Sequence, residues 1–526
     1  MDHTGSDEYA TFHRPFDLRI IREPGYVQMS PRKRQICWDF GVPAREEPVM
    51  LVDRLTLRLD RGSIILLTGP SGSGKSSVLR AIAERAGSQG WLSAGGFPTD
   101  RAIVEAISPW APLATALEIL TACGLGEPRL WIRRFADLSE GEQFRASLAR
   151  AIGSALGGAR GRLILCDAFA STLHRRMAKA MAYNLRKLVS RHGLTLVVAA
   201  INDDIMDDLQ PDQTVRLGMA GPEVILHQPG DRPMSLQRHA VIEEGSVRDY
   251  RLFSPMHYRH RDGLGFVDRV FLLRESPGGE PVGILVFAHA PAELALRNQC
   301  TEGRFIRDTR RLNRELRILR RLVMHPDLRG CGLGHWFVAN TLPRVGVRFV
   351  ECLASMGVVN PVFERAGMHR VGQCPPPRGR LKLLERLRQF DIDPLAADFH
   401  LRIARCPRVR RMVERTIGDW ARRTQGASPY KLDGRVPAEL ARTFRQIIGR
   451  PPVYYLWDRD GVYPRPARAA DALPRSRPER TTSPDVDGCR PARGRSAHAD
   501  RHHPEAGPGT GQLRTRGCFS DEVADC

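Results

Sequence analysis

Hydrophobic and polar residues alternate in short blocks along the first half of the chain. Three apolar runs, bounded by glycine or charged residues, lie at residues 63–68, 163–166 and 194–199, and helical stretches separate them. Short apolar runs of this kind are typical of strands that a sheet buries on both faces. From Val49 onward the pattern therefore predicts an α/β domain with a mostly parallel sheet, which ends at the breaker cluster 229–233.

A second mixed pattern begins near Val241 and predicts an α+β domain. The turn residues Ser276 to Gly279 separate two apolar runs and indicate a β-hairpin. After Pro375 the chain looks helical and strongly basic, and from Gly461 it holds many Pro and Gly but few large apolar residues. The predicted parts are a strap (1–48), the α/β domain (49–235), the α+β domain (236–375), a basic, mostly helical region (376–460) and a disordered tail (461–526).

Composition restricts the class of protein. No apolar run approaches the length of a bilayer span, and the polar, acid-containing N-terminus does not resemble a secretory signal, so we expect a cytoplasmic protein without a membrane partner. The net charge of +21 favours a nucleic-acid partner. Only six of the 80 basic residues are Lys, however, so GC-rich coding explains the charge equally well. The eleven cysteines show no Cys-x-x-Cys pair and indicate neither disulfides nor zinc.

The strongest chemical motif follows the first predicted strand and precedes a helical run over 77–86. Its glycines let consecutive main-chain amides face one anion, and the helix N-terminus adds positive potential. Lys75 would neutralise the β and γ phosphates of ATP, and the Ser76 hydroxyl would bind Mg²⁺. The predicted ATP-binding loop consists of Gly69, Pro70, Ser71, Gly72, Ser73, Gly74, Lys75, Ser76 and Ser77.

Two later segments resemble those of ABC-type ATPases. Ser139-Glu140-Gly141 precedes a helical run, like a signature sequence, and an apolar run that ends at Asp167 is similar to a Walker B strand. The resemblance covers about residues 49–228. It implies that Ser139 and Gly141 of one head close over the ATP of another, which makes a homodimer. It also implies that Asp167 supports the Mg²⁺ ion together with Ser76.

Three residues depart from the ABC pattern. Ala168 stands where the family usually has the glutamate that activates water, His174 replaces a usual aspartate, and Asn202 replaces a usual histidine. A missing general base typically costs about 10² to 10⁴ in rate, so we expect ATP binding with weak or absent hydrolysis. Alternatively, Glu142 or Asp203 has taken over the role of the base.

A second glycine-rich turn lies between a predicted strand (318–324) and a predicted helix. Such a turn can present main-chain amides to a pyrophosphate, although a purely structural turn is the alternative reading. The spacing resembles the Arg/Gln-x-x-Gly-x-Gly motif of GNAT-type N-acetyltransferases, which implies an acetyl-CoA site. The residues predicted to contact acetyl-CoA are Val323, Met324, Arg329, Gly330, Cys331, Gly332, Leu333, Gly334 and Asn360.

Downstream residues extend this second resemblance. Residues 349–354 look like the next strand, and the resemblance implies that the thioester lies where the two strands splay apart. The segment from Asn360 is similar to the one that closes such folds, but Phe363 stands where the family often has a tyrosine that protonates the thiolate. Glu315 and Glu351 are candidate catalytic bases, and a surface acid is the alternative for each.

Together the motifs predict an ATP-gated, acetyl-CoA-dependent N-acetyltransferase, and residues 40–375 resemble a family of ABC-type ATPases fused to a predicted acetyltransferase domain. Analogy with tRNA acetyltransferases suggests RNA, or an RNA-associated protein, as acceptor. Arginines in 304–321 and 402–423 would contact phosphates, with Trp420 and Tyr454-Tyr455 stacking bases, or else form solvated helical faces. The alternative from another class is a nucleic-acid-binding ATP clamp with a degenerate acyltransferase domain.

Overall fold

The computed structural model describes residues 15–25, 28–45, 47–86, 97–157, 162–169, 171, 173–218, 221–228, 230, 232–257, 263–376, 379–425 and 435–463. The chain divides into two compact units. The first unit contains the described residues up to Pro375 and those from Arg450 onward, and the second lies between Pro376 and Gly449. No helix in these ranges is long and apolar enough to cross a membrane. The predicted tail falls outside the described residues, apart from 461–463.

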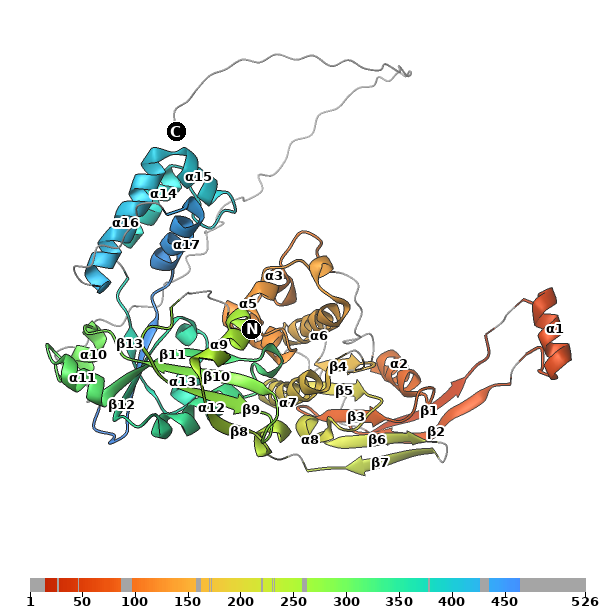
Figure 1. The fold of residues 1–526 in the computed structure, drawn as a ribbon. Coiled ribbons are helices and arrows are strands. Elements are labelled where there is room, and N and C mark those ends of the chain that lie inside the picture. Colours follow the sequence, from red (N-terminus) through yellow and green to blue (C-terminus); the bar gives the residue numbers. More distant parts are fainter. Residues whose placement is uncertain are drawn as a thin grey trace, which may run out of the picture. The chain divides into compact units, whose positions relative to one another are not determined.

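The N-terminal part of the first unit is built on a five-stranded sheet with the strand order β4-β5-β3-β6-β7 (Figure 1). The first four strands in this order are parallel, and β7 is antiparallel to β6. The mostly parallel sheet predicted from the sequence is therefore confirmed. The strands are β3 (Ile64–Thr68), β4 (Leu163–Cys166), β5 (Thr195–Ala199), β6 (Gln213–Gly218) and β7 (Gly221–Leu226).

Every residue of β3, β4 and β5 is buried, which explains why these strands read as uninterrupted apolar runs. Helices lie on both sides of this sheet (Figure 1). They are α2 (Lys75–Ala86), α3 (Ile103–Ile107), α4 (Leu113–Ala122), α5 (Pro128–Trp131), α6 (Glu140–Leu156), α7 (Arg175–His192) and α8 (Met206–Leu209).

The predicted strap contains ordered structure that the sequence interpretation missed. Strand β1 (Phe16–Arg22) pairs antiparallel with β2 (Val49–Leu57), and helix α1 (Pro31–Phe40) lies in the connection, at the end of this ribbon in Figure 1. In β1, Phe16, Leu18 and Ile20 are buried and alternate with exposed residues. The strap prediction is therefore wrong for these residues, because their period-two alternation is that of a half-buried strand.

The second part of the first unit is a seven-stranded sheet with the strand order β13-β14-β12-β11-β10-β9-β8. Only β11 and β12 pair in parallel. The predicted hairpin is present as β9 and β10. The elements are β8 (Val241–Gly245), α9 (Tyr250–Phe253), β9 (Val267–Arg274), β10 (Pro281–Ala288), α10 (Ala295–Cys300), α11 (Thr309–Glu315), β11 (Leu316–Met324), α12 (Leu333–Thr341), β12 (Phe349–Ala354), α13 (Val362–Arg365) and β13 (His369–Gln373).

Strand β14 (Val453–Asp458) corrects the predicted extent of the basic helical region, which was taken to reach residue 460. The chain returns after Arg450, and β14 inserts antiparallel between β12 and β13. Tyr454 and Tyr455 on this strand are fully buried. The prediction that these two tyrosines stack on nucleic-acid bases is therefore wrong.

The described residues of the second unit form four helices around an apolar core of their own. These are α14 (Arg380–Gln389), α15 (Phe399–Arg405), α16 (Pro407–Gln425) and α17 (Pro437–Ile448). The core residues include Phe399, Val413, Ile417 and Phe444, and Trp420 packs against this core. Because its side chain is partly buried there, Trp420 is also a poor candidate for base stacking.

Candidate functional site

The first glycine-rich loop joins β3 to α2 in a conformation that requires glycine. Gly69, Gly72 and Gly74 have φ angles of 145°, 82° and 94°. A Cβ atom at Gly69 would lie 2.3 Å from the Leu217 carbonyl oxygen, so no other residue fits there without a shift of the backbone. The loop then opens directly into helix α2, whose first N–H groups have no intrahelical acceptor. The loop thus has the backbone shape that a phosphate group requires.

The side chains of this loop also fit a polyphosphate. The Lys75 ammonium donates to the carbonyl oxygens of Gly69 and Pro70, both at 2.7 Å. Burial lowers the pKa of Lys75, and the nearby Asp167 carboxylate opposes that shift. The Ser73 hydroxyl is buried and has no hydrogen-bond partner among the described residues. Phosphate oxygens are stronger acceptors than carbonyls and would satisfy both groups.

Asp167 lies at the end of β4, as the resemblance implied, and Ala168 follows it. The Asp167 carboxylate accepts a hydrogen bond of 2.8 Å from the Ala168 amide, and Ala168 has a φ angle of 49°. The Ala168 side chain is exposed and carries no proton acceptor. Asp167 and the Ser76 hydroxyl are therefore chemically suited to Mg²⁺. At the position of the water-activating glutamate, Ala168 cannot act as a general base.

The signature residues lie at the N-terminus of the long helix α6. Ser139 is its N-cap and is exposed, while Gly141 is half-buried. The Glu142 carboxylate accepts a hydrogen bond of 2.9 Å from the Ser139 amide, and the two residues form a capping box. Glu142 therefore caps its own helix, which argues against it as a substitute base. Asp203, the other candidate base, is exposed.

The second glycine-rich turn leads from β11 through the short 3₁₀ helix Pro326–Leu328 to α12. Gly330 and Gly332 have φ angles of 85° and 92°, and Gly332 is the N-cap of α12. The side chains of Cys331 and Leu333 are buried in the core. The turn therefore has the glycine-dependent backbone shape of a strand-to-helix turn that precedes a helix N-terminus.

Strands β11 and β12 part just before this turn. Their parallel pairing ends at Leu319 and Cys352, whereas β11 runs on to Met324 and stays paired with β10. Val323 and Met324, both predicted to contact acetyl-CoA, lie on this extension and are buried. A Cβ atom on Gly334 would lie 3.5 Å from Val362, so α12 approaches α13 here. Asn360 is exposed just before α13.

Arg329 has a different role from the one its motif suggested. Its guanidinium donates to the carbonyl oxygens of Met324, Gly126 and Met256, at 3.3, 3.2 and 2.7 Å. Burial lowers its pKa. Because these carbonyls hold the guanidinium, any contact of Arg329 with a diphosphate would come from its main chain. The side chain instead ties the turn to Gly126 of the N-terminal domain.

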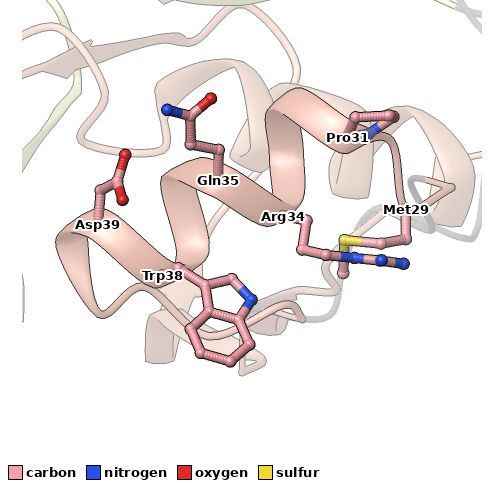
Figure 2. Close-up of a pocket in the computed structure, with 6 residues that line it drawn as sticks. All are labelled: Met29, Pro31, Arg34, Gln35, Trp38 and Asp39. Atoms are coloured by element: carbon pink, nitrogen blue, oxygen red, sulfur yellow. The ribbon is translucent and has the colours of Figure 1, made fainter.

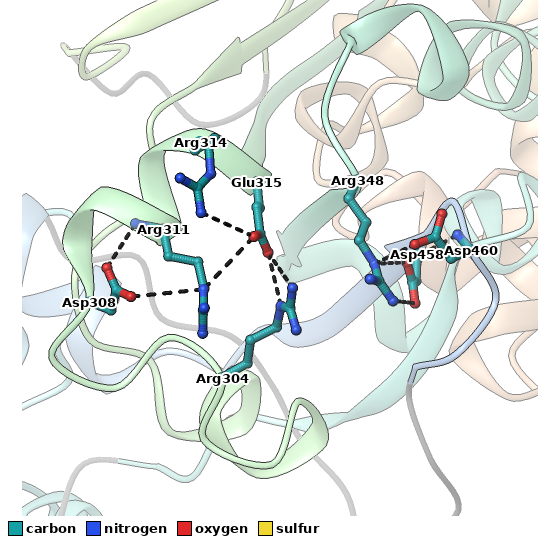
Figure 3. A network of polar contacts seen from close by, with 8 residues as sticks. All are labelled: Arg304, Asp308, Arg311, Arg314, Glu315, Arg348, Asp458 and Asp460. Carbon is teal, nitrogen blue, oxygen red and sulfur yellow. Dashed lines mark hydrogen bonds and ion pairs between the residues drawn. The ribbon is translucent and has the colours of Figure 1, made fainter.

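Neither predicted catalytic base is free. Glu315 lies in a network of arginines shown in Figure 3, where its carboxylate accepts a hydrogen bond of 2.9 Å from Arg304 and pairs with Arg311 and Arg314. The same figure shows a neighbouring cluster in which Arg348 pairs with Asp458 and Asp460. Glu315 therefore pairs with three guanidinium groups, which is a structural role.

Glu351 is fully buried. One carboxylate oxygen lies 3.2 Å from Arg297, and the other accepts a hydrogen bond of 2.9 Å from the Tyr454 hydroxyl. Burial raises the pKa of Glu351 to about 7, against the opposing charge of Arg297. An acceptor amine cannot reach a carboxylate enclosed in this way. Phe363, at the position of the expected tyrosine, packs against the ring of Tyr455 at 5.4 Å and donates no proton.

Helix α7 connects the two domains of the first unit, and no sequence signal indicated it. Arg176 pairs with Glu275, Glu280 and Asp327 of the second domain at 2.8, 3.5 and 3.6 Å. One turn further on, Ala180 belongs to the core of the second domain. These contacts fix one face of α7 against that domain.

The same helix reaches the second glycine-rich turn. The Asn184 amide donates to the Arg329 carbonyl oxygen at 3.3 Å. A Cβ atom on Gly330 would lie 2.6 Å from Thr121 of α4 and 3.2 Å from the Asn184 amide nitrogen. The N-cap of α7 is His174, which follows the Walker B aspartate closely in the sequence, so one helix leads from that segment to this turn.

A hollow of about 430 Å³ lies on α1, away from both glycine-rich turns. It is lined by Met29, Pro31, Arg34, Gln35, Trp38 and Asp39 (Figure 2). Trp38 is 82% exposed, and no residue of α1 is buried.

Comparison with known proteins shows the family to which the first domain belongs. The family model of the AAA ATPase domain matches residues 42–199. The lipoprotein-releasing ATP-binding protein LolD of Novosphingobium aromaticivorans is 30% identical over 200 residues, which cover 31% of this chain and 85% of LolD. The aliphatic sulfonates import protein SsuB of Yersinia pestis is 26% identical over 231 residues, or 39% of this chain and 81% of SsuB.

The phosphate-binding loop, the Walker B strand and these relatives define a phosphate-loop ATPase domain of ABC type. Through this domain the chain belongs to the family of ABC-type ATP-binding proteins, and it binds ATP. The chain spans only 19% of the ABC-type transporter frbG of Dothideomycetidae sp., to which it is 25% identical over 304 residues. A solved dimeric bacterial ABC transporter cassette is 19% identical, with a TM-score of 0.27, over 33% of this chain and 88% of that one.

Proposed function

We propose that the protein is an ATP-gated, acetyl-CoA-dependent N-acetyltransferase of GNAT type with weak or absent ATP hydrolysis. The observation that carries the proposal is the position of the second glycine-rich turn. It lies where β11 and β12 part, and it is held by α7 of the ATPase domain through Asn184. The first feature is the one that the resemblance to N-acetyltransferases implies, and the contact with α7 supports the link to ATP.

In the ATPase domain, the loop amides and Lys75 would hold the phosphates, and Ser76 with Asp167 would hold Mg²⁺. The signature residues, exposed Ser139 and half-buried Gly141, would contact the nucleotide of a second head. Because Ala168 cannot accept a proton, the ATP-bound pair would persist rather than turn over quickly. ATP would then act as a regulatory ligand that joins two copies of the chain.

In the second domain, the amides from Gly330 to Gly334 would bind the diphosphate of coenzyme A. The free side of β11, from Arg320 to Met324, would align the extended arm of the coenzyme. Main-chain N–H groups on this edge would also polarise the thioester carbonyl. Glu315 and Glu351 are engaged and Phe363 carries no proton, so the transfer would rely on positioning of the two reactants, which alone supplies a large rate effect.

Gating would act through helix α7. The segment that leads from Asp167 to His174 would respond when two heads close. Arg176 and Asn184 would carry that response to the glycine-rich turn, because both contact the second domain directly. ATP binding would thereby favour the conformation of the turn that holds acetyl-CoA.

The test is transfer of labelled acetyl groups from acetyl-CoA to cellular RNA and protein fractions, with and without ATP. We expect labelling of RNA, or of an RNA-associated protein, that increases when ATP or a non-hydrolysable analogue is present. Lys75→Ala should lose the ATP effect but keep basal transfer. Gly332→Ala, which forces a side chain into a φ angle of 92°, should lose transfer under all conditions. Absence of any labelled product, with acetyl-CoA binding also absent in calorimetry, would refute the proposal.

One alternative has specific support. The engaged carboxylates and Phe363 are also what a degenerate acyltransferase domain would show, and the chain would then be a nucleic-acid-binding ATP clamp. In that case the protein should bind nucleic acid with a steep salt dependence and transfer no acetyl group.

A further inference from the structure

We propose that the C-terminal helical unit binds the phosphate backbone of a nucleic acid along one face of α16. The inference deepens the proposed function by locating the surface that would hold an RNA acceptor, and its role in catalysis rests on that function. Binding itself does not depend on it.

Helix α16 has two distinct faces. Val409, Val413 and Ile417 are buried in the core of the unit. On the opposite side, exposed arginines recur after three, four and seven residues, which places them in one row along the helix. We call them the arginine row: Arg408, Arg411, Arg415 and Arg422. From the first to the last, the row spans about 21 Å at the rise of an α-helix.

Most of the positive charge on this row is not neutralised. Arg408 and Arg415 have no acidic partner among the described residues, and Arg411 donates only to the Pro407 carbonyl oxygen, at 3.4 Å. Arg422, by contrast, pairs with Asp419. Residues 376–449 as a whole contain 17 Lys and Arg against eight Asp and Glu. The row therefore presents three guanidinium forks, which match the geometry of phosphate oxygens.

The form of the row favours nucleic acid over a membrane. A helix that lies on a lipid surface needs an apolar face turned toward the bilayer. The apolar face of α16 packs against Phe444 and the rest of the unit's core, and no large apolar residue is exposed on the described part of α16. A line of charges about 21 Å long instead faces about six phosphates of one strand.

The contacts would be independent of sequence. Arginines that meet phosphates fix position and register but read no bases. Trp420, the aromatic residue on α16, packs against the core and is not available for stacking. The surface would thus add affinity and orientation, and any choice of acceptor would lie elsewhere.

The test measures binding of the full chain to short fluorescent probes by anisotropy, without ATP or acetyl-CoA. The probes are single-stranded RNA, duplex RNA and duplex DNA of mixed sequence, together with vesicles containing phosphatidylserine. The row variant carries Arg408→Gln, Arg411→Gln and Arg415→Gln, which keep helix propensity but remove three charges. The matched control removes three charges from exposed positions of the first unit whose arginines also have no acidic partner among the described residues, with Arg22→Gln, Arg54→Gln and Arg101→Gln.

For wild type we expect nucleic-acid binding that weakens between about 50 and 200 mM salt. The row variant should bind at least about tenfold more weakly, and its slope of log affinity against log salt should fall by about 2 to 3, since each lost contact removes about 0.7 (single strands) to 0.9 (duplex). The control should keep the wild-type slope. Lysine at the same three positions should restore most of the slope. This result would show that the row variant binds weakly because it lacks charge and not because it is misfolded.

Equal losses in the row variant and the control would overturn the inference, because net charge alone would then explain binding. Binding to vesicles but not to nucleic acid would overturn it as well. Because neither substrate of the proposed transfer is present, failure here leaves the acetyl-transfer test unaffected, and failure of that test leaves this one intact.

Discussion

At the scale of single residues, the chemistry of the ATP site can be predicted from the types of its residues and their spacing in the sequence. Gly69, Lys75 and Asp167 occupy the positions that their motifs predict because phosphate binding needs a fixed backbone shape, one ammonium group and one carboxylate. The second site is different. There the acids singled out from the sequence are held by neighbouring arginines, so their residue types alone were misleading.

Glu351 allows a prediction about pH. Its pKa is raised from 4.5 to about 7, so the folded chain keeps a proton that the unfolded chain has released. Wild-type stability should therefore fall as the pH rises from about 4.5 through 7. Glutamine stays neutral at every pH and mimics the protonated acid. We expect the stability of Glu351→Gln, relative to wild type, to rise by about 2 to 3 kcal/mol between pH 5 and pH 8, measured by urea unfolding.

The opposite trend would have a clear meaning. If the variant loses stability relative to wild type as the pH rises, the carboxylate is ionised in the folded protein and its pair with Arg297 is net stabilising. Tyr454→Phe removes the second partner of Glu351 and keeps the carboxyl group, so its stability should keep falling with pH as in wild type.

Some residues could not have been found from the sequence at all. Arg176 and Asn184 lie in an ordinary amphipathic helix, and their partners are about 100 and 145 residues further along the chain. Nothing in their spacing marks them, because their function depends on how two domains pack. The same holds for Arg297, whose carboxylate partner is 54 residues away.

At the scale of elements, prediction succeeded where burial gives a simple pattern. The buried strands β3, β4 and β5 were located to within about two residues because both faces of each strand are apolar. It failed at β1, where exposed charged residues alternate with buried apolar ones in a half-buried strand, and at β14. Strand β14 was grouped with the preceding basic helices, since its place between β12 and β13 is a long-range pairing that local composition does not record.

Helix α7 gives the prediction at this scale. Arg176→Met removes a guanidinium that is 13% exposed and that faces Glu275, Glu280 and Asp327. The acids would remain close together without their cation, so we expect a loss of roughly 2 kcal/mol and a separation of the two domains' transitions in calorimetry. The response of acetyl transfer to ATP should weaken as well.

Arg238→Met is the matched control for α7. It removes an ion pair with Asp207 in which both side chains are well exposed, 40% and 60%. Exposed pairs contribute little, so this variant should unfold like wild type. A single shared transition in Arg176→Met, at the wild-type temperature, would show that α7 does not couple the domains.

At the scale of the whole molecule, the two glycine-rich turns differ in how much of each the sequence could reveal. The ATPase domain, its fold and its loop follow from motifs in the sequence. The interpretation of the second domain as an acyltransferase rests on one turn and a few flanking residues, and the sheet order of this domain and its attachment to α7 emerge only in three dimensions. The proposal that ATP regulates the second domain depends on that attachment.

The proposal that ATP acts as a regulatory ligand predicts a dimer that forms with ATP and lasts long because hydrolysis is slow. The exposed signature at Ser139 is available to a second copy, and Ala168 provides no base to end the ATP-bound state. We expect the chain to elute as a monomer without nucleotide and as a dimer with Mg²⁺ and ATP, in size-exclusion chromatography with light scattering. Lys75→Ala, which loses the phosphate-binding ammonium, should remain monomeric under both conditions.

The variant Ala168→Glu distinguishes how long the ATP-bound dimer lasts from whether the dimer forms. Glutamate at this position supplies the missing proton acceptor, so hydrolysis should rise by about 10² or more and the dimer should disperse as ATP is consumed. A non-hydrolysable analogue should hold this variant as a dimer, which shows that pairing itself is intact. If wild type hydrolyses ATP as fast as Ala168→Glu, or if it stays monomeric with ATP, then ATP does not act in this chain as a lasting link between heads.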